Sequence, residues 1–258
     1  MRVATFNLLH GRSLAHGGVV EAELRAAARE IDADVVGMQE VDRCQPRSLG
    51  ADQAAVVADS LGAPHWRFVP VLHGTPGATW TASDLDDGGD DDGPAYGVAL
   101  ASRLPVRSWH VRRFGPAPVG MPLFIPGRGL VPVHDEPRVA LAAVLDTASG
   151  PLTVVTAHLS FVPGWNVAQL RAVRQWVQAL PAPRVLLGDL NLPGPVARLA
   201  TRWASAARQA TYPSWRPRVQ FDHVLLDGLP VSAVRGARAL RLPVSDHCGL
   251  VVDLSDHW

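Results

Sequence analysis

Hydrophobic and polar residues alternate along this chain in short blocks that mostly have the length and composition of β-strands. The blocks are bounded by Gly, Pro, Asn and Asp, which favour turns. This pattern predicts strands at residues 2–9, 34–39, 96–101, 139–146, 152–157, 184–187, 221–226 and 248–254. Apolar residues at helical spacing predict two helices, at residues 19–31 and 167–180.

The second predicted strand differs from the others, because its apolar residues occupy both faces. Val35, Val36 and Met38 include both odd and even positions, as expected for a strand that is buried on two sides. The two predicted helices each carry one apolar stripe, which is suited to covering a sheet. The pattern therefore predicts a layered α/β protein.

Two segments lack a regular pattern. Residues 84–92 read DLDDGGDDD, with six aspartates and one apolar residue, so we expect a mobile acidic surface loop. A calcium-binding loop is the alternative, but the spaced ligands and terminal Glu of an EF-hand are missing. Residues 115–137 are crowded with Pro and Gly, which predicts a second long irregular excursion without a domain boundary.

Length and composition narrow the class of protein. A chain of 258 residues with 47% hydrophobic residues is consistent with one domain covering residues 1–258. No apolar run is long enough to span a bilayer, and residues 3–9 are too short for a signal-peptide core, so we expect a cytoplasmic protein. Cys44 and Cys248, the only cysteines, are too few for a disulfide scaffold or a thiolate zinc site.

Polar residues close several of the predicted strands, and strand ends are positions from which side chains can reach a cleft. Asn7 ends the first strand, Glu40 follows the strand that is buried on two sides, and His158 follows residues 152–157. Each has an ordinary alternative as a turn former, a paired carboxylate or a hydrogen-bonded structural histidine. In Gly188-Asp189-Leu190-Asn191, the Asp and Asn lie at i and i+2 and can face the same side.

Two Asp-His pairs complete the set of candidate residues. Asp222-His223 begins one predicted strand, and Asp246-His247 precedes the last one. Adjacent residues on a strand face opposite sides, so a loop position suits Asp246 and His247. Asp222 is then able to hydrogen-bond His247 and fix its tautomer.

These residue types match the needs of phosphate-ester hydrolysis. A phosphate ester repels an attacking hydroxide, and a divalent cation reduces that repulsion. The oxygen donors of Asn7, Glu40, Asp189, Asn191 and Asp246 suit Mg²⁺ or Mn²⁺. Zinc is less suited, because these motifs contain neither cysteine nor an HExxH pattern.

In this order, the segments TFNLLHG, QEVD, YGVALASRLPV, TAHL, GDLN, FDHVLL and SDH resemble the endonuclease/exonuclease/phosphatase superfamily, which has the fold of pancreatic deoxyribonuclease. The resemblance runs from residue 3 to about residue 254. It implies a four-layer α/β sandwich, with two mixed β-sheets packed face to face, helices on the outside and an active site at one edge.

The resemblance also implies roles for individual residues. Asn7 and Glu40 match magnesium-site residues, with Asp246 near the same ion. Asp189 and Asn191 match residues that position or deprotonate the attacking water, contact the phosphate or share a second metal ion.

The histidines have counterparts in the family as well. His158 matches a histidine that binds the phosphoryl oxygen or protonates the leaving group, and His247 with Asp222 matches a base and its orienting partner. Tyr96 matches a phosphate-contacting tyrosine or a carboxylate partner of the histidine. Arg138 matches an arginine that binds the substrate phosphate, and packing or a surface ion pair is the alternative for these last two residues.

Charge guides the choice of substrate. The formal net charge is zero, all 24 basic residues are Arg, and residues 84–92 are acidic, so no overall positive field attracts nucleic acid. We therefore expect a phosphodiesterase or phosphomonoesterase of a small or lipid-derived substrate. A DNA or RNA nuclease is the alternative if the arginines of residues 103–113 or 198–218 form a basic groove. A catalytically inactive binding module would lack one of the candidate residues, and none is missing.

Overall fold

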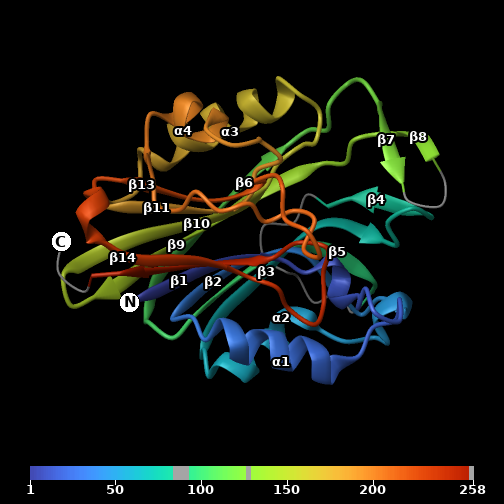
Figure 1. Ribbon diagram of the computed structural model, residues 1–258, viewed down its shortest axis with the longest axis horizontal. Helices are drawn as coiled ribbons and strands as arrows, with labels where there is room; N and C mark the ends of the chain where they lie inside the picture. Colours follow the sequence, from blue (N-terminus) through green and yellow to red (C-terminus); the bar gives the residue numbers. More distant parts are fainter. Residues whose placement is uncertain (84–92, 126–128, 256–258) are drawn as a thin grey trace.

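Two mixed β-sheets packed face to face form the centre of the computed structural model, which describes residues 1–83, 93–125 and 129–255 (Figure 1). In order across the seven-stranded sheet, the strands are β14 (Val234–Leu240), β15 (Gly249–Leu254), β1 (Arg2–Asn7), β2 (Val35–Arg43), β5 (Ala95–Ser102), β3 (His65–Gly74) and β4 (Trp80–Ala82). In the six-stranded sheet they are β12 (Ala204–Ser205), β13 (Asp222–Asp227), β11 (Arg184–Asp189), β10 (Gly150–His158), β9 (Arg138–Thr147) and β6 (Val106–Phe114).

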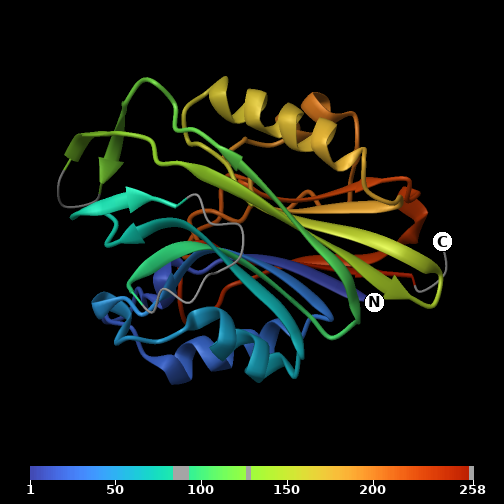
Figure 2. The same cartoon turned by 180° about the vertical axis from the view of Figure 1, so that it is seen from behind.

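Helices cover the two outer faces of this pair of sheets, as Figures 1 and 2 show from opposite sides. The seven-stranded sheet carries α1 (Glu21–Ile31) and α2 (Gln53–Leu61), and the six-stranded sheet carries α3 (Trp165–Val177) and α4 (Val196–Thr201). Short 3-10 helices occur at Leu9–Gly11, Pro46–Ser48 and Val231–Ala233. The predicted four-layer α/β sandwich is confirmed. Among the described residues, no helix is long and apolar enough to cross a membrane.

Apolar side chains fill the space between the layers in the way that the sequence pattern predicts. In α1, the predicted stripe of Leu24, Ala28 and Ile31 is buried against the outer face of the seven-stranded sheet. Val35 packs between the two sheets, whereas Val36 packs under the helices. The two-sided burial expected of this strand is therefore confirmed, and it follows from strand geometry, since successive side chains point to opposite faces.

The eight predicted strands are all present, and several elements that the sequence pattern did not predict join them, including α2, β3 and β6. The prediction that residues 115–137 are irregular throughout is wrong. They contain a hairpin of β7 (Met121–Ile125) and β8 (Gly129–Val133). The strand pattern was hidden because Pro122 and Pro132, which are poor strand residues, face each other in this hairpin. The acidic segment 84–92 lies outside the described residues.

Candidate active site

Strand pairing brings distant polar residues together at one edge of the sandwich. In the six-stranded sheet, His158 on β10 pairs with Asp189 on β11, and Asp189 pairs with Asp222 on β13. Asn7 ends β1 in the other sheet, and its Nδ2 donates a 3.0 Å hydrogen bond to Asp189 Oδ2. The predicted candidates from both sheets therefore meet across the interface between them.

Local departures from ideal strand geometry orient some of these side chains toward the site. The pairing of β2 with β5 slips between Met38 and Val41, and Glu40 within this bulge has a φ of +53°. A bulge turns a side chain away from the regular alternation, so it directs Glu40 into the site. Next to Asp189, Gly188 allows β11 to approach β10 closely. A Cβ at this position would lie 2.1 Å from the carbonyl oxygen of Ala157 on β10.

Glu40 lies close to the acidic side chains of Asp246 and Asp189. Its Oε1 accepts a 3.1 Å hydrogen bond from Asn7, but among the described residues no arginine forms an ion pair with it. Burial and the nearby charge of Asp246 raise the pKa of Glu40 to about 7. Burial likewise raises the pKa values of Asp189 and Asp246. The site therefore favours an added positive charge.

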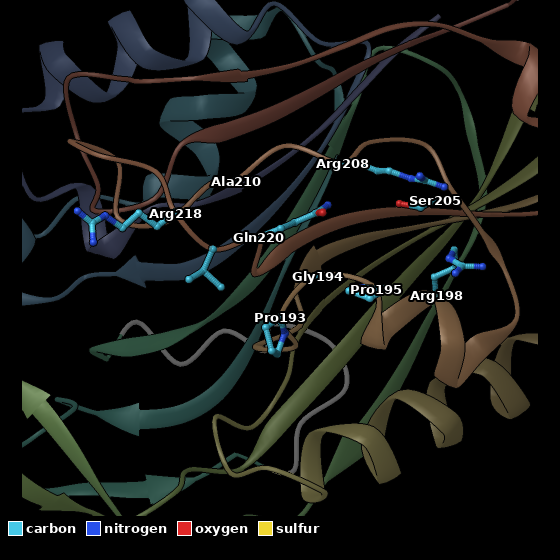
Figure 3. A pocket seen from close by; sticks show the side chains of 10 residues that line it. Pro193, Gly194, Pro195, Arg198, Ser205, Arg208, Ala210, Arg218 and Gln220 are labelled. Carbon is cyan, nitrogen blue, oxygen red and sulfur yellow. The ribbon is translucent and has the colours of Figure 1, made fainter.

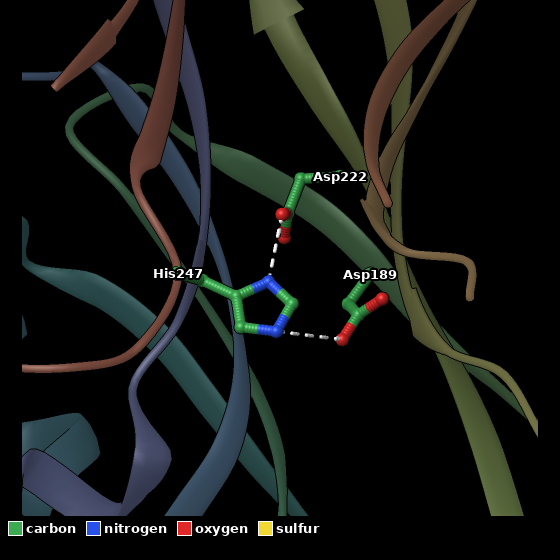
Figure 4. Close-up of side chains that lie close together, drawn as sticks. All are labelled: Asp189, Asp222 and His247. Atoms are coloured by element: carbon green, nitrogen blue, oxygen red, sulfur yellow. Dashed lines mark hydrogen bonds and ion pairs between the residues drawn. The ribbon is translucent and has the colours of Figure 1, made fainter. Parts of the chain in front are cut away.

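Asp222 and His247 form the predicted dyad, shown in Figure 4. His247 Nδ1 lies 2.8 Å from Asp222 Oδ2, and its Nε2 lies 3.8 Å from Asp189 Oδ2. Burial opposes the imidazolium charge, but the carboxylates of Asp222 and Asp189 outweigh it and raise the pKa of His247 to about 10. Asp246 and His247 lie in a loop, as predicted, and Ser245 ties that loop to β1 by donating a 2.6 Å hydrogen bond to the Asn7 carbonyl.

His158 and Arg138 form a second polar contact on the opposite side of Asp189. Arg138 Nη1 lies 3.3 Å from His158 Nδ1, and its Nη2 donates to Asp135 Oδ1 at 2.9 Å. Burial and the charge of Arg138 hold the pKa of His158 well below its ordinary value, so this ring is neutral. Arg138 is buried rather than part of a surface ion pair, and its Nε has no hydrogen-bond partner.

These groups open into one pocket of about 610 Å³, called here the catalytic pocket. Most of the predicted site residues line it, namely Glu40, Tyr96, Arg138, His158, Asp189, Asn191, Asp246 and His247. Asn7 and Asp222 lie behind this wall. Asn7 holds the carboxylate of Asp189, and Asp222 holds the ring of His247. The structure thus brings together the whole set of predicted residues.

Some residues of the pocket were not predicted. Tyr212 packs on the ring of His247 with 4.9 Å between ring centroids, and it also contacts Phe221. Phe161 is different, because the sequence of residues 161–165, directly after the strand that ends at His158, predicts a rim of the pocket there; its ring lies against the guanidinium of Arg138. The sequence around an aromatic residue in a loop does not reveal which side chain it will contact. One hint was present, because the chain has only two tyrosines and both line this pocket.

The chemical nature of the donor set is suited to a divalent cation. Asp189, Asp222 and His247 form one cluster able to hold a metal ion, but the bond between Asp222 and His247 already uses two of its ligand atoms. Glu40 and Asp246 offer carboxylate oxygens that repel each other without a cation, and Mg²⁺ or Mn²⁺ prefers such hard oxygen donors. Asn7 keeps its amide nitrogen toward Glu40 and Asp189, so its oxygen ligates only if the amide turns over.

Solved structures with the same fold cover nearly the whole chain. An endonuclease/exonuclease/phosphatase from Beutenbergia cavernae matches at 25% identity and a TM-score of 0.63, over 99% of this chain and 72% of its own. A mannosyl-6-phosphatase of Bacteroides thetaiotaomicron matches at 16% identity and a TM-score of 0.61, over 98% of this chain and 99% of its own. Sphingomyelinase C from Streptomyces griseocarneus matches at 17% identity and a TM-score of 0.59, over 99% of both chains.

The family comparison agrees with the geometry of the site. No curated protein matches this sequence. The sequence profile described as the Endonuclease/Exonuclease/phosphatase family matches residues 4–257, and the polar residues at its strand ends form the pocket described above. The chain therefore belongs to the endonuclease/exonuclease/phosphatase family, whose members hydrolyse phosphate esters.

Proposed function

We propose that this protein is a divalent-metal-dependent phosphoesterase that cleaves a phosphodiester or phosphomonoester of a small or lipid-derived substrate by water attack. One observation carries the proposal: the pocket encloses the carboxylates of Glu40, Asp189 and Asp246 close to two histidines and an arginine. The carboxylates support cation binding, and the N–H groups of Arg138, beside the neutral ring of His158, support hydrogen bonding to phosphoryl oxygens.

Glu40 and Asp246 are the proposed ligands of Mg²⁺ or Mn²⁺, with Asp189 and Asn191 as further oxygen donors in the same pocket. Asn7 would add its oxygen after its amide turns over. The cation would polarise a phosphoryl oxygen and stabilise the charge of the leaving oxygen. Asp189 and Asn191 orient the attacking water, since Asp189 is held by Asn7 Nδ2 and by the backbone N–H of Asn191. Its carboxylate is thereby fixed for accepting a proton.

The two histidines receive different roles from their partners. His158 and Arg138 point nitrogen atoms into the pocket and are proposed to bind phosphoryl oxygens. His247 is proposed to carry a proton during the reaction, because Asp222 fixes its Nδ1 and leaves Nε2 toward Asp189 and the pocket. Tyr96 is proposed as a substrate contact on the pocket wall.

The dimensions and lining of the pocket support a small substrate or a lipid headgroup. A volume of about 610 Å³ lies within the range of small-molecule sites, and Phe161, Tyr212 and Phe221 add aromatic surface for a leaving group. Within residues 103–113, Arg103 is paired with Asp32 and Arg107 with Asp146, which reduces the positive charge that these two arginines offer to a nucleic acid.

A nuclease is the second candidate, and one observation favours it. Arg198, Arg208 and Arg218 line a separate pocket next to the catalytic one, as the alternative from sequence requires. A nucleic-acid backbone would need such cations along its path, although the rest of the chain balances its charges.

Hydrolysis of a substrate panel separates these functions. Bis-p-nitrophenyl phosphate, p-nitrophenyl phosphate, supercoiled plasmid and single-stranded DNA are each incubated with Mg²⁺, Mn²⁺ or chelator. Cation-dependent turnover of the small esters with intact DNA supports the proposal. Nicked or degraded DNA at low enzyme concentration favours the nuclease, and activity that survives the chelator refutes the metal-dependent mechanism.

A further inference from the structure

A second pocket of about 670 Å³ lies beside the catalytic pocket and is rich in arginine. Arg198, Arg208 and Arg218 line it together with Ser205, Gln220 and small or apolar residues, and none of its lining residues is acidic. We call it the arginine groove. The groove therefore concentrates positive charge in a chain whose formal net charge is zero.

The three guanidinium groups of the groove are free to bind an anion. Within the described ranges, no carboxylate or carbonyl is paired with the side chain of Arg198, Arg208 or Arg218. Arg103 and Arg184 differ from these three, since each of them bonds a carboxylate. Unpaired guanidinium groups retain their full capacity for two-pronged hydrogen bonds to phosphate oxygens.

The arginine groove continues directly from the catalytic pocket. Pro193 lines both pockets, and Gly194 donates a backbone hydrogen bond to the Gln220 carbonyl next to it. Tyr212, which packs on His247, exchanges two backbone hydrogen bonds with Val219 of the groove wall. A ligand held at the catalytic centre can therefore extend past Pro193 into the groove.

The walls of the groove are fixed before any ligand binds. Gln220 Nε2 donates to the carbonyl oxygens of Ala207 and Asp222, and Ser205 Oγ also donates to the Ala207 carbonyl. These bonds join the segment that carries Arg208 to the start of β13, where Asp222 holds His247. A binding site with fixed walls loses less entropy when the ligand is bound.

The arginines are distributed along the groove rather than around one point. Figure 3 shows Arg198 and Arg208 at one end, near Ser205, and Arg218 at the other end, with Pro193 and Gln220 between them. Resting on the proposed function, we propose that the groove binds a second phosphate group of the substrate, which Arg198 and Arg208 hold away from the phosphate ester being cleaved. The enzyme would then select substrates that carry at least two phosphates.

Two esters with the same leaving group test this proposal. Thymidine 5′-(4-nitrophenyl phosphate) and its 3′-phosphorylated form differ only by the distal phosphate, and release of nitrophenolate reports both reactions. We expect kcat/KM to be about 10-fold higher for the 3′-phosphorylated ester, mainly through a lower KM, because the distal contact is made in the ground state and the transition state alike. The combined variant Arg198→Gln, Arg208→Gln is expected to lose this preference.

Arg29→Gln is the matched control, because Arg29 is an exposed arginine on α1, on the other side of the sandwich. This control should keep the preference, and circular dichroism should show the wild-type fold for all variants. Equal kcat/KM values for the two esters in the wild-type enzyme, or a preference that persists in the double variant, would overturn the proposal.

Calorimetry separates failure of the groove from failure of the proposed function. Thymidine 3′,5′-bisphosphate should bind about 10-fold more tightly than thymidine 5′-phosphate, and less so at high salt. If this holds without turnover of either ester, the groove stands and the proposed reaction fails. Equal affinities overturn the groove even when both esters are cleaved. Much tighter binding of a single-stranded oligonucleotide than of the bisphosphate, lost in the double variant, overturns the small-substrate form of the proposal.

Discussion

Replacing Glu40 by glutamine should stabilise the metal-free protein while it removes activity. In the folded protein, burial and the charge of Asp246 raise the pKa of Glu40 to about 7, from an ordinary value of 4.5. The ionised carboxylate therefore opposes folding at neutral pH. Glutamine keeps a carbonyl oxygen that can accept the hydrogen bond from Asn7, but it carries no charge, so the repulsion disappears.

The size of this effect follows from the difference between the two pKa values. At about 1.4 kcal/mol for each tenfold change in proton affinity, the charge costs about 3 kcal/mol. Glu40 keeps partial contact with solvent, so we expect about 2 kcal/mol of added stability for Glu40→Gln above pH 7. For a chain of this size, that corresponds to a rise in Tm of about 5 °C.

The pH dependence provides an internal check on the sign. Because the pKa of Glu40 is raised in the folded state, its destabilising charge is present above about pH 7 and disappears as the pH falls toward 4.5. The advantage of the variant should therefore shrink between pH 8 and pH 5. Mg²⁺ should raise the Tm of the wild-type protein more than that of the variant.

Thermal unfolding in chelator at pH 8 and pH 5 measures these differences. Glu30→Gln is the control, because Glu30 is an exposed carboxylate at the end of α1, and it should leave the Tm unchanged. A Glu40→Gln protein that is no more stable than the wild type at pH 8 would refute the reasoning. It would mean that the carboxylate of Glu40 is not under charge repulsion in the metal-free site.

Three further predictions concern the dyad, the metal and the core. His247→Ala should lower kcat in steady-state assays by about 100-fold or more with the fold retained, and Asp222→Asn should also lower kcat. Unchanged activity in His247→Ala would refute the role assigned to His247. Chelator should abolish hydrolysis and added Mg²⁺ or Mn²⁺ should restore it, whereas persistent activity would exclude the proposed mechanism. Gly37→Ala should lower the free energy of unfolding, measured in urea, by about 1–3 kcal/mol, because the added Cβ would lie 2.6 Å from Thr156 Oγ1. An unchanged urea midpoint would mean that the two sheets move apart to accept the methyl group without loss of stability.

Much of the architecture was predictable from sequence because strands and amphipathic helices have short periods. Alternation and two-sided burial at Val35 and Val36 depend only on neighbouring residues and on strand geometry. Elements with weaker local signals were missed. β6 is an edge strand whose sequence, VRSWHVRRF, intersperses charged and apolar residues, and β7 and β8 contain facing prolines.

The sequence also indicated the residues of the candidate site, because polar side chains end apolar strands at Asn7, His158 and Asp189. It did not show how they are arranged. Asn7 and Asp189 lie 182 residues apart in the chain and meet only because the two sheets pack face to face. The direction in which the Glu40 side chain points depends on a bulge between β2 and β5. The pairing between two strands cannot be predicted from the sequence of one strand alone.

By itself, the sequence determined the layers, the strand ends that carry the polar residues and the chemical types available for binding a cation and a phosphate. Tertiary structure alone decided which charges are neutralised. Arg103 and Arg107 are paired with carboxylates, whereas Arg198, Arg208 and Arg218 remain unpaired beside the catalytic pocket. The physical reason is that hydrophobic periodicity acts between near neighbours in the chain, whereas electrostatic pairing and burial depend on distances in space.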